Sequence, residues 1–339
     1  MTDAHTRGMR AVALVAPGQV EIVDDWPEPE PGPDDVVVQI RGVGLCGSDL
    51  SVYDGTREVP GMPWVFGHEG GGDIVASGPG VTGREVGQRV VIEPNFADGT
   101  CAACLAGHTS ACDDRQVLAI TRTGILAERV AVPADYTWPI SSDWPDVALA
   151  CVEPLVVAHT AVRRADVPVG ADCLVIGAGS QGQLVCQSLL AAGAQPYVLE
   201  PHPGRLELAL KLGARPAEEH HGDTYPLVFE TAGVPSVWEQ AYNAVAKTGK
   251  LVVIGFNDKP AQLTTIDLVQ RQITIVGQLI YDHPVDFQAT LAAVSAGQLA
   301  PAQTVQGTFG VEETAAALAS VREIAGKSWI EFSSWRDGS

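Results

Sequence analysis

Side chains that can bind a metal ion stand at four positions of the sequence. Cys46 lies in GVGLCGSDLS, His68 and Glu69 lie in FGHEGGG, and Glu153 lies in CVEPL. Each alone has an ordinary structural explanation, because cysteine packs as a small hydrophobe and buried polar groups usually find hydrogen-bond partners. Together they supply a thiolate, an imidazole and carboxylates, the ligand types of a catalytic zinc that keeps one position open for water or substrate. We therefore expect a catalytic zinc site, and we interpret Cys151 as a packing residue.

A second group of metal-ligand residues lies within one short segment, CAACLAGHTSAC. Three thiolates and one imidazole make a closed tetrahedral ligand set for a structural zinc. A lobe without metal is the alternative, and the sequence leaves both open. The four residues concerned are Cys101, Cys104, His108 and Cys112.

A glycine fingerprint typical of dinucleotide binding lies in CLVIGAGSQGQLVCQSLLAAGA. It has the G-x-G-x-x-G spacing directly after an apolar strand pattern and at the start of a helical one. The glycines permit a tight turn and a close approach of the backbone, so that a pyrophosphate can sit on free N–H groups at the helix N-terminus. A turn that only packs the helix on the strand is the alternative. The residues expected to bind the cofactor here are Gly177, Gly179, Ser180, Gln181 and Gly182.

The choice of cofactor depends on Glu200, which closes the next predicted strand, PYVLE. Its carboxylate can accept hydrogen bonds from the adenosine ribose hydroxyls, and it would repel a ribose phosphate. No arginine lies among residues 201–204. Arg205 is a further candidate for cofactor binding, although its place in GRLELALKLGA suits a helix start. We therefore expect NAD rather than NADP.

The composition excludes several classes of partner. With 339 residues, 46% of them hydrophobic, the chain can bury a sizeable core. Its formal charge of −20, from 41 acidic and 21 basic residues, would repel phosphate backbones and anionic lipids, so we expect no nucleic acid and no membrane partner. The seven unevenly placed cysteines do not resemble a secreted disulfide framework, and the first apolar run is too short for a signal peptide. A cytoplasmic location is expected.

The sequence contains two kinds of secondary-structure pattern. Up to about residue 150, short alternating strands separated by Gly, Pro and Asp indicate a mostly antiparallel β domain. From about residue 170, buried strands alternate with helical stretches, which implies a doubly wound parallel sheet and an α/β fold. After about residue 298 the pattern changes again, with strands in TVQGTFG and KSWIEF around a helix in VEETAAALASVREIAG. We expect residues 1–157 and 298–339 to form the first domain and residues 158–297 the second.

With these motifs the chain resembles the zinc-dependent medium-chain alcohol and polyol dehydrogenases. The resemblance rests on GVGLCGSD, FGHEGGGDIVASGPGV, GQRVVIEP, CVEPLVVAHTAVRRA, the glycine fingerprint, FETAG and GKLVVIGF. It implies a GroES-like catalytic domain and a Rossmann domain. It also implies that Cys46, His68 and Glu153 are zinc ligands. Glu69 is then an alternating ligand or a close neighbour, and Asp49 orients the histidine.

The position of Glu153 in VEPL is similar to that in the sorbitol, glucose and threonine dehydrogenase branch, where a carboxylate replaces a second thiolate. A carboxylate can leave and rejoin the metal, so that a vicinal diol can bind through two oxygens. We expect reversible oxidation of a secondary alcohol on a polyol, sugar or (amino)cyclitol to its ketone, with hydride passing to the nicotinamide. A threonine or simple alcohol dehydrogenase is one alternative, and a non-catalytic NAD-binding relative is another.

Two serines of the opening motif receive different roles. Ser48 is expected to accept the proton of the substrate alcohol first. Many members of the family carry a histidine where this chain has Ser51, and that imidazole can pass the proton on to solvent. Because a serine hydroxyl has no pKa near neutrality, Ser51 cannot act as such a base. We expect the proton to leave through water or another loop, and Ser51 to be dispensable.

The strand-like segment ITIVGQLI bears on the oligomeric state. The family resemblance suggests that it pairs across a subunit boundary at a sheet edge, although a buried strand would have the same pattern. We expect a homo-oligomer, either a dimer or a tetramer. Residues near the motifs could line the substrate pocket or be ordinary loop residues, namely Tyr53, Asp54, Arg57, Asn95 and Phe96.

Overall fold

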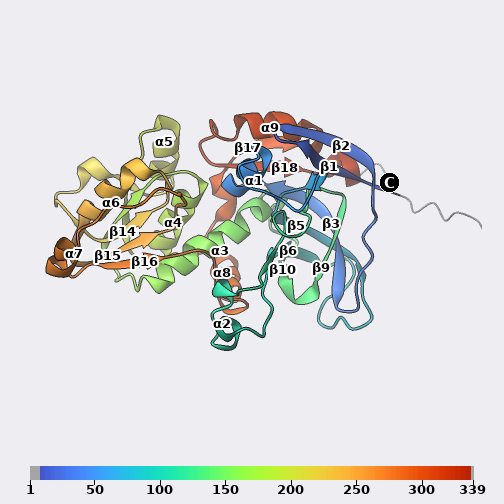
Figure 1. The fold of residues 1–339 in the computed structure, drawn as a ribbon, viewed down its shortest axis with the longest axis horizontal. Coiled ribbons are helices and arrows are strands. Elements are labelled where there is room, and N and C mark those ends of the chain that lie inside the picture. Colours follow the sequence, from blue (N-terminus) through green and yellow to red (C-terminus); the bar gives the residue numbers. More distant parts are fainter. Residues whose placement is uncertain (1–7, 337–339) are drawn as a thin grey trace, which may run out of the picture. The chain divides into compact units, whose positions relative to one another are not determined.

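The computed structural model describes residues 8–336, and the chain divides into two compact units. Among the described residues, unit 1 contains residues 8–153 and 305–336, and unit 2 contains residues 154–304. In Figure 1 the blue, blue-green and red parts of the chain belong to unit 1, and the yellow and orange parts belong to unit 2. The division falls within helix α3 (Leu149–Arg164). The domain boundaries expected from the sequence, at residues 157 and 298, stay predictions.

Unit 1 is built on a mostly antiparallel sheet in the strand order β10-β6-β5-β3-β18-β17, with β9 pairing β3. β3 is central because its valines and isoleucine are buried and it pairs with three other strands. A smaller sheet has the order β2-β1-β4. The strands are β1 (Met9–Ala16), β2 (Gln19–Trp26), β3 (Asp35–Gly44), β4 (Trp64–Val65), β5 (Glu69–Ser77), β6 (Arg89–Ile92), β9 (Arg129–Pro133), β10 (Thr137–Pro139), β17 (Val305–Gly310) and β18 (Lys327–Glu331).

The last part of the chain completes unit 1, as expected. β18 pairs antiparallel with β3 and parallel with β17. The helix between them, α9 (Thr314–Ser320), is shorter than the sequence pattern predicted. After Ser320 the backbone turns instead of continuing the helix, and the carbonyl of Ser320 accepts the N–H of both Glu323 and Ile324.

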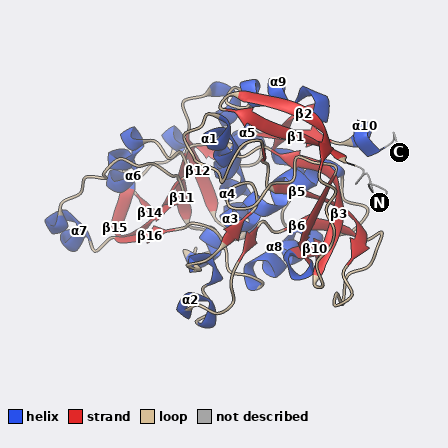
Figure 2. Ribbon diagram, turned by 45° about the vertical axis from the view of Figure 1, so that its right-hand side comes forward, coloured by secondary structure: helices blue, strands red, loops and turns tan. Residues whose placement is uncertain are grey.

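Unit 2 contains a six-stranded parallel sheet in the order β13-β12-β11-β14-β15-β16. The order runs outward from β11 in both directions, so the topological switch point lies between β11 and β14. Figure 2 shows these strands side by side, with helices such as α4 and α6 beside them. The elements are β11 (Asp172–Ile176), α4 (Ser180–Ala191), β12 (Gln195–Leu199), α5 (Pro203–Lys211), β13 (Arg215–Pro216), β14 (Tyr225–Glu230), α6 (Trp238–Ala244), β15 (Val245–Val253), α7 (Thr265–Arg271), β16 (Thr274–Gly277) and α8 (Val285–Ser295).

The predicted α/β architecture is therefore confirmed, with an antiparallel sheet in one unit and a doubly wound parallel sheet in the other. All seven cysteines lie among the described residues and are free thiols. Over residues 8–336, no helix has both the length and the apolar character that a membrane crossing requires.

Candidate functional site

The pairing of β3 with β5 brings three predicted metal ligands together. Gly44 of β3 pairs with Glu69 of β5, Cys46 follows this pair by two residues, and His68 precedes it by one. Gly44 also lies against the start of α3, because an added Cβ would lie 2.6 Å from the carbonyl oxygen of Ala150. One ligand atom each of Cys46, His68 and Glu69 therefore lies within 4.8 Å of the other two.

Asp49 fixes the two segments that carry these residues. It is fully buried in α1 (Gly47–Tyr53) and accepts the backbone N–H groups of Cys46 at 2.9 Å and Gly67 at 3.1 Å. Its Oδ1 also lies 3.1 Å from Nδ1 of His68. Burial disfavours the imidazolium, but the Asp49 carboxylate more than offsets this and raises the pKa of His68. With Nδ1 donating to Asp49, Nε2 is the nitrogen left for a metal.

Glu69 has a partner that sequence reasoning missed. Its Oε2 lies 2.5 Å from Nζ of Lys327 in β18, and both side chains are almost completely buried. Burial alone would lower the pKa of Lys327, but the Glu69 carboxylate raises it instead. The one signal in the sequence was a lysine at the start of the apolar strand KSWIEF, a position that a core strand seldom gives to a charge.

Glu153 is not a member of this group of three. It is a buried residue on α3. Its role as a zinc ligand stays a prediction. Cys151, two residues earlier on the same helix, is fully buried, and burial raises the pKa of its thiol to about 12. Such a thiol is neutral near pH 7, in keeping with a packing role.

The two serines of the opening motif point to different neighbours. Oγ of Ser48 lies 3.4 Å from Nε2 of His68, the nitrogen that faces the predicted metal position. The hydroxyl of Ser51 instead donates to the carbonyl oxygen of Gly47 at 3.2 Å, one turn back in α1. Only Ser48 is therefore directed at the ligand group.

The side chains of three residues considered for the substrate pocket contact other parts of the protein. The hydroxyl of Tyr53 donates to the carbonyl oxygen of Gly18 at 2.9 Å, and Asp54 pairs with Arg322 at 2.6 Å. Phe96 is buried, and its ring forms a T-shaped pair with that of Tyr136. The pocket roles of Tyr53, Asp54, Arg57, Asn95 and Phe96 stay predictions.

The cysteine-rich segment contains a second group of potential ligands, in which a carboxylate joins the three expected cysteines. Three thiols and a carboxylate lie within 4.8 Å of one another, from Asp98, Cys101, Cys104 and Cys112. His108 is not a member of this group. It precedes the short helix at Thr109–Ala111.

Asp98 reaches the cysteines because of a tight turn. Its Oδ1 accepts the backbone N–H groups of Thr100 at 2.6 Å and Cys101 at 2.8 Å, and its own N–H donates to Sγ of Cys112 at 3.3 Å. The two hydrogen bonds to backbone N–H groups hold the pKa of Asp98 well below its usual range. The sequence pattern did not reveal this, because aspartate is common in turns that bind nothing.

In unit 2 the glycine fingerprint forms the expected turn from β11 to α4. Gly177 has a φ of +89°, which favours glycine. A Cβ at Gly182 would lie 2.0 Å from the carbonyl oxygen of Gly177, so this glycine is needed for helix and strand to approach. A Cβ at Gly179 would meet no atom within 4 Å, so a ligand could approach the backbone there. Ser180 and Gln181 form the first turn of α4.

Glu200 follows β12 and is held against the glycine turn. Its Oε2 accepts the N–H of Ala178 at 2.7 Å, and its Oε1 accepts the N–H of His202 at 2.8 Å. Arg205 lies in the first turn of α5, where its backbone N–H donates to Nδ1 of His202. Glu200 is therefore placed at the carboxyl ends of the parallel strands, the edge where dinucleotides bind in this class of sheet.

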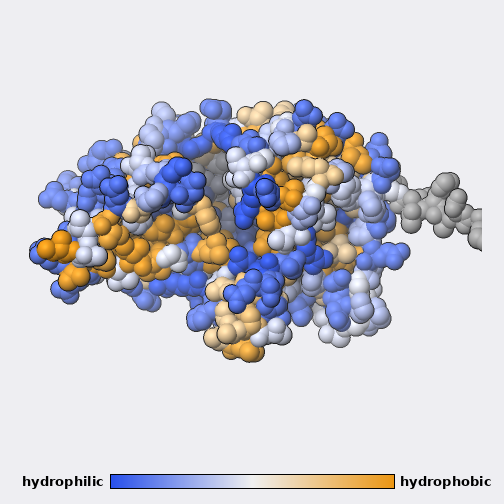
Figure 3. Space-filling view, viewed as in Figure 1, coloured by the Kyte–Doolittle hydropathy of each residue, from blue (hydrophilic) through white to orange (hydrophobic). Residues whose placement is uncertain are grey.

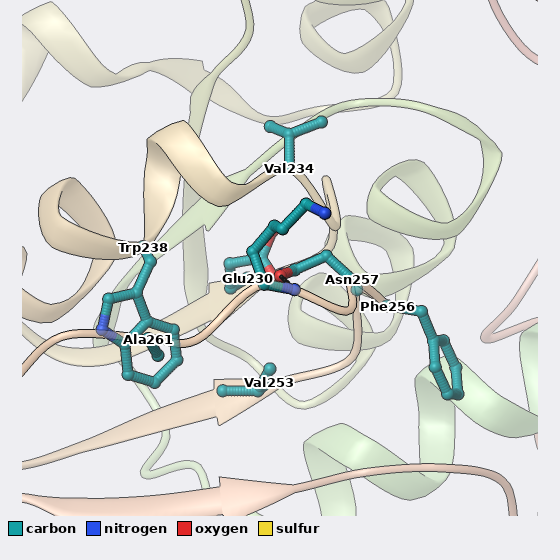
Figure 4. A pocket seen from close by; sticks show the side chains of 9 residues that line it. Glu230, Val234, Trp238, Val253, Phe256, Asn257 and Ala261 are labelled. Atoms are coloured by element: carbon teal, nitrogen blue, oxygen red, sulfur yellow. Dashed lines mark hydrogen bonds between the residues drawn. The ribbon is translucent and has the colours of Figure 1, made fainter.

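A cavity of about 220 Å³ opens beyond β14 and β15, at the same edge of the sheet (Figure 4). Glu230 lies in its wall and accepts the N–H groups of Ala232 and Gly233, each at 2.8 Å. Burial raises the pKa of Glu230. Figure 4 shows Asn257 beside Glu230, while the ring of Phe256 points away. The motif FETAG was visible in the sequence, but the cavity was not, because residues of two separate loops enclose it.

Comparison with known proteins identifies the family. Residues 32–142 match the model of the alcohol dehydrogenase GroES-like domain, and residues 182–296 match that of the zinc-binding dehydrogenase. The L-threonine 3-dehydrogenase of Pyrococcus horikoshii is 31% identical over 79% of this chain and 82% of that protein. The chain belongs to the zinc-type medium-chain alcohol dehydrogenase family. It is accordingly a zinc-type oxidoreductase, with a GroES-like and a Rossmann part.

Two further proteins are similar to this dehydrogenase over most of its length. The sorbitol dehydrogenase of Bombyx mori is 29% identical over 87% of this chain and 90% of its own length. The crystal structure of an alcohol dehydrogenase from Escherichia coli CFT073, complexed with NADH, has 26% identity and a TM-score of 0.88, covering 96% of this chain and 99% of that chain.

Proposed function

We propose that this dehydrogenase interconverts a secondary alcohol of a polyol, sugar or (amino)cyclitol and its ketone, with NAD as hydride acceptor. The observation that carries the proposal is the meeting of Cys46, His68 and Glu69 beside Ser48 in unit 1. A purely structural protein would not need a thiolate, an imidazole and a carboxylate converging at one point. Unit 2 contributes the dinucleotide-binding turn and Glu200.

The donor set fits a zinc ion. Cys46 and His68 offer a sulfur and a nitrogen, which zinc prefers, and Asp49 leaves Nε2 of His68 available. Glu153 would complete the set, and Glu69 would be an alternating ligand or a neighbour. Zinc held there supplies Lewis acidity that makes the substrate hydroxyl easier to deprotonate.

Ser48 would receive the proton of the substrate hydroxyl at its Oγ and would pass its own hydroxyl proton on. Its distance of 3.4 Å from Nε2 of His68 places it next to the predicted metal position. Ser51 is directed at its own helix backbone and lacks a suitable pKa, so it would take no part. Water or a residue from another loop would carry the proton to solvent.

NAD would bind along the carboxyl edge of the parallel sheet. The pyrophosphate would lie on the turn at Gly177, Gly179 and Gly182, and Glu200 would accept the ribose hydroxyls. Glu200 already accepts the N–H of Ala178, so its negative charge is held where a ribose phosphate of NADP would be repelled. Solved structures of the same fold hold either NADH or NADP, so the choice of NAD rests on Glu200 alone.

The substrate class rests on Glu153 and on the similarity to a sorbitol dehydrogenase. The similarity to threonine dehydrogenase keeps that activity as the alternative. Polyols, sugars, cyclitols, threonine and simple alcohols should be assayed with NAD before and after chelation. Faster turnover of threonine than of any polyol would select the alternative. No turnover of any of them by protein that holds zinc and NAD would instead favour a non-catalytic role.

We also propose a structural zinc in the cysteine-rich segment, with Asp98 as its fourth ligand in place of His108. Three thiolates and one carboxylate are sufficient for a closed four-coordinate site. The geometry supports Asp98, because a carboxylate oxygen of this residue lies within 4.8 Å of the three sulfurs.

A homo-oligomer is proposed through the free edge of the sheet in unit 2. β16 pairs with β15 on one side, and most of its residues are exposed. Ile266 and Val269 of the adjacent α7 are 65% and 71% exposed, and Figure 3 shows hydrophobic colouring over α7 at the left end. Ile266→Asp combined with Val269→Asp should shift a dimer or tetramer toward the monomer in sedimentation velocity.

A cytoplasmic location is proposed as well. The seven free thiols agree with the reducing conditions of the cytoplasm.

A further inference from the structure

The segment that follows β16 is held at the carboxyl edge of the parallel sheet. Residues 278–284 join β16 to α8, and the N–H of Gln278 donates to the last carbonyl oxygen of β15 at 2.9 Å. Gln278 and Tyr281 are buried, and the Tyr281 ring forms a T-shaped pair with that of Phe287 on α8. Leu279 lies between these two buried residues and is 43% exposed. The segment therefore presents an apolar side chain to solvent while the residues around it are anchored.

One guanidinium, that of Arg164, binds this segment at two points. Arg164 is the last residue of α3, and its Nη1 donates to Oε1 of Gln278 at 3.3 Å. Its Nη2 donates to the carboxylates of Asp282 at 2.5 Å and of Asp286 on α8 at 3.2 Å. Asp286 also accepts the N–H of Asp282 at 2.8 Å. Because a guanidinium has several donors in a rigid planar arrangement, Arg164 fixes both Gln278 and Asp282.

The contacts of Arg164 are better suited to holding a segment than to stabilising the fold. The side chains of Arg164 and Asp282 are 35% and 16% exposed. Ion pairs with partly exposed members contribute little to the free energy of unfolding. Loss of the guanidinium should therefore leave unit 2 folded and give residues 278–284 more freedom.

The place of this segment in the sheet indicates which half of a dinucleotide it would meet. Glu200 follows β12, on one side of the glycine turn after β11, and is proposed to accept the adenosine ribose. β14, β15 and β16 lie on the other side of β11. A dinucleotide crosses such a sheet at its switch point, so the nicotinamide half would extend over the carboxyl ends of these three strands. Leu279 lies directly after the outermost of them.

We propose that Arg164 is a positioning residue, which holds residues 278–284 in place so that Leu279 packs against the nicotinamide half of the cofactor. This proposal rests on the NAD site proposed above. A segment that is already ordered loses less conformational entropy on binding than a mobile one. Arg164 therefore raises the affinity for the nicotinamide half and has no effect on the adenosine half.

ADP-ribose separates the two halves, because it contains the adenosine, the pyrophosphate and a ribose but no nicotinamide. The full-length protein is titrated calorimetrically with NADH and with ADP-ribose. Arg164→Met keeps the aliphatic stem and removes the guanidinium. It should bind NADH about tenfold more weakly than the wild type, the cost of ordering one or two side chains on binding, and should bind ADP-ribose equally well. A variant that had only lost structure would lose both affinities together.

Two further variants act on the segment itself. Asp282→Asn removes the carboxylate that Arg164 binds there, and it should weaken NADH binding while leaving ADP-ribose binding unchanged. Combined with Arg164→Met it should cause no additional loss, because both changes break the same contact. Leu279→Ala should show the same selective loss, because it removes the proposed contact with the nicotinamide half.

Arg163→Met is the matched control, because Arg163 precedes Arg164 on α3 and its guanidinium pairs with Asp286 of α8 at 2.7 Å. It should keep both affinities of the wild type. An equal loss of NADH binding in Arg163→Met would overturn the proposal, because any positive charge at the end of α3 would then have the same effect.

The proposal would also be overturned by unchanged NADH affinity, or by equal losses of NADH and ADP-ribose affinity, in folded Arg164→Met. If Arg164→Met does not fold, unchanged NADH affinity in Asp282→Asn or Leu279→Ala decides against it in the same way. Failure of the wild type to bind ADP-ribose would overturn the proposed dinucleotide site itself, which is a distinct outcome.

Discussion

Nδ1 of His68 lies 3.1 Å from Oδ1 of Asp49, and the same carboxylate accepts the N–H of Cys46. One buried side chain thus orients an imidazole and fixes the segment that carries a thiolate. Both belong to the proposed zinc site, so the affinity of that site depends on a residue that does not itself bind the metal.

Asp49→Asn should weaken zinc binding at this centre by about 10- to 100-fold. In Asp49 one carboxylate oxygen faces the imidazole of His68 and the other accepts the N–H of Cys46. An amide has only one oxygen, so it cannot accept both hydrogen bonds in this way. Competition with a chelator measures the loss. Asp143→Asn, at an exposed position, is the control. Unchanged zinc affinity in Asp49→Asn would contradict this orienting role.

Removal of the metal should abolish turnover while leaving NAD binding largely intact, because the ligand group lies in unit 1 and the dinucleotide-binding turn lies in unit 2. Cys46→Ser and His68→Ala should behave in the same way. NAD titration and metal analysis of each preparation provide the check. Near-normal rates in either variant, shown to be free of metal at this centre, would refute a zinc-dependent reaction.

Ser48→Ala should slow alcohol oxidation by roughly 10²- to 10⁴-fold, the usual effect of a lost proton-transfer group. Ser51→Ala should have little effect, because the Ser51 hydroxyl donates to the carbonyl of Gly47. The pH dependence of oxidation should be recorded for both variants and the wild type. The reverse pattern, with a large loss only in Ser51→Ala, would exchange the two roles.

Glu200→Gln should weaken NAD binding by about 1 to 3 kcal/mol, the scale of hydrogen bonds to a charged group, and should narrow the gap between NAD and NADP. Fluorescence titration with both dinucleotides measures this. Glu207→Gln, exposed on α5, is the matched control. Tighter binding of NADP than NAD by the wild type would show that the assignment of Glu200 is wrong.

The zinc content of purified protein tests the cysteine-rich segment. We expect two zinc ions per chain in the wild type, one in Asp98→Asn and two in His108→Ala. The asparagine keeps an oxygen for the N–H groups of Thr100 and Cys101, so the turn is retained while the charged ligand is lost. If His108→Ala instead contained only one zinc ion per chain, the imidazole of His108 would be the fourth ligand. One zinc ion per chain in the wild type would mean that the cysteine-rich segment binds no metal.

The sequence by itself determined the features that depend on short segments. Alternating and helical periodicities predicted both sheets, and the spacing at Gly177, Gly179 and Gly182 predicted the turn, because strands, helices and glycine turns are encoded by neighbouring residues. Cys46, His68 and Glu69 could be chosen because their side chains have few roles besides metal binding when they occur together.

Only the tertiary structure decided which residues meet across the chain. Lys327 and Glu69 are 258 positions apart, and no local pattern connects them. Asp98 joins three cysteines through one tight turn. Such contacts depend on strand register and on turn geometry, which follow from the packing of the whole unit and not from the residues of one segment.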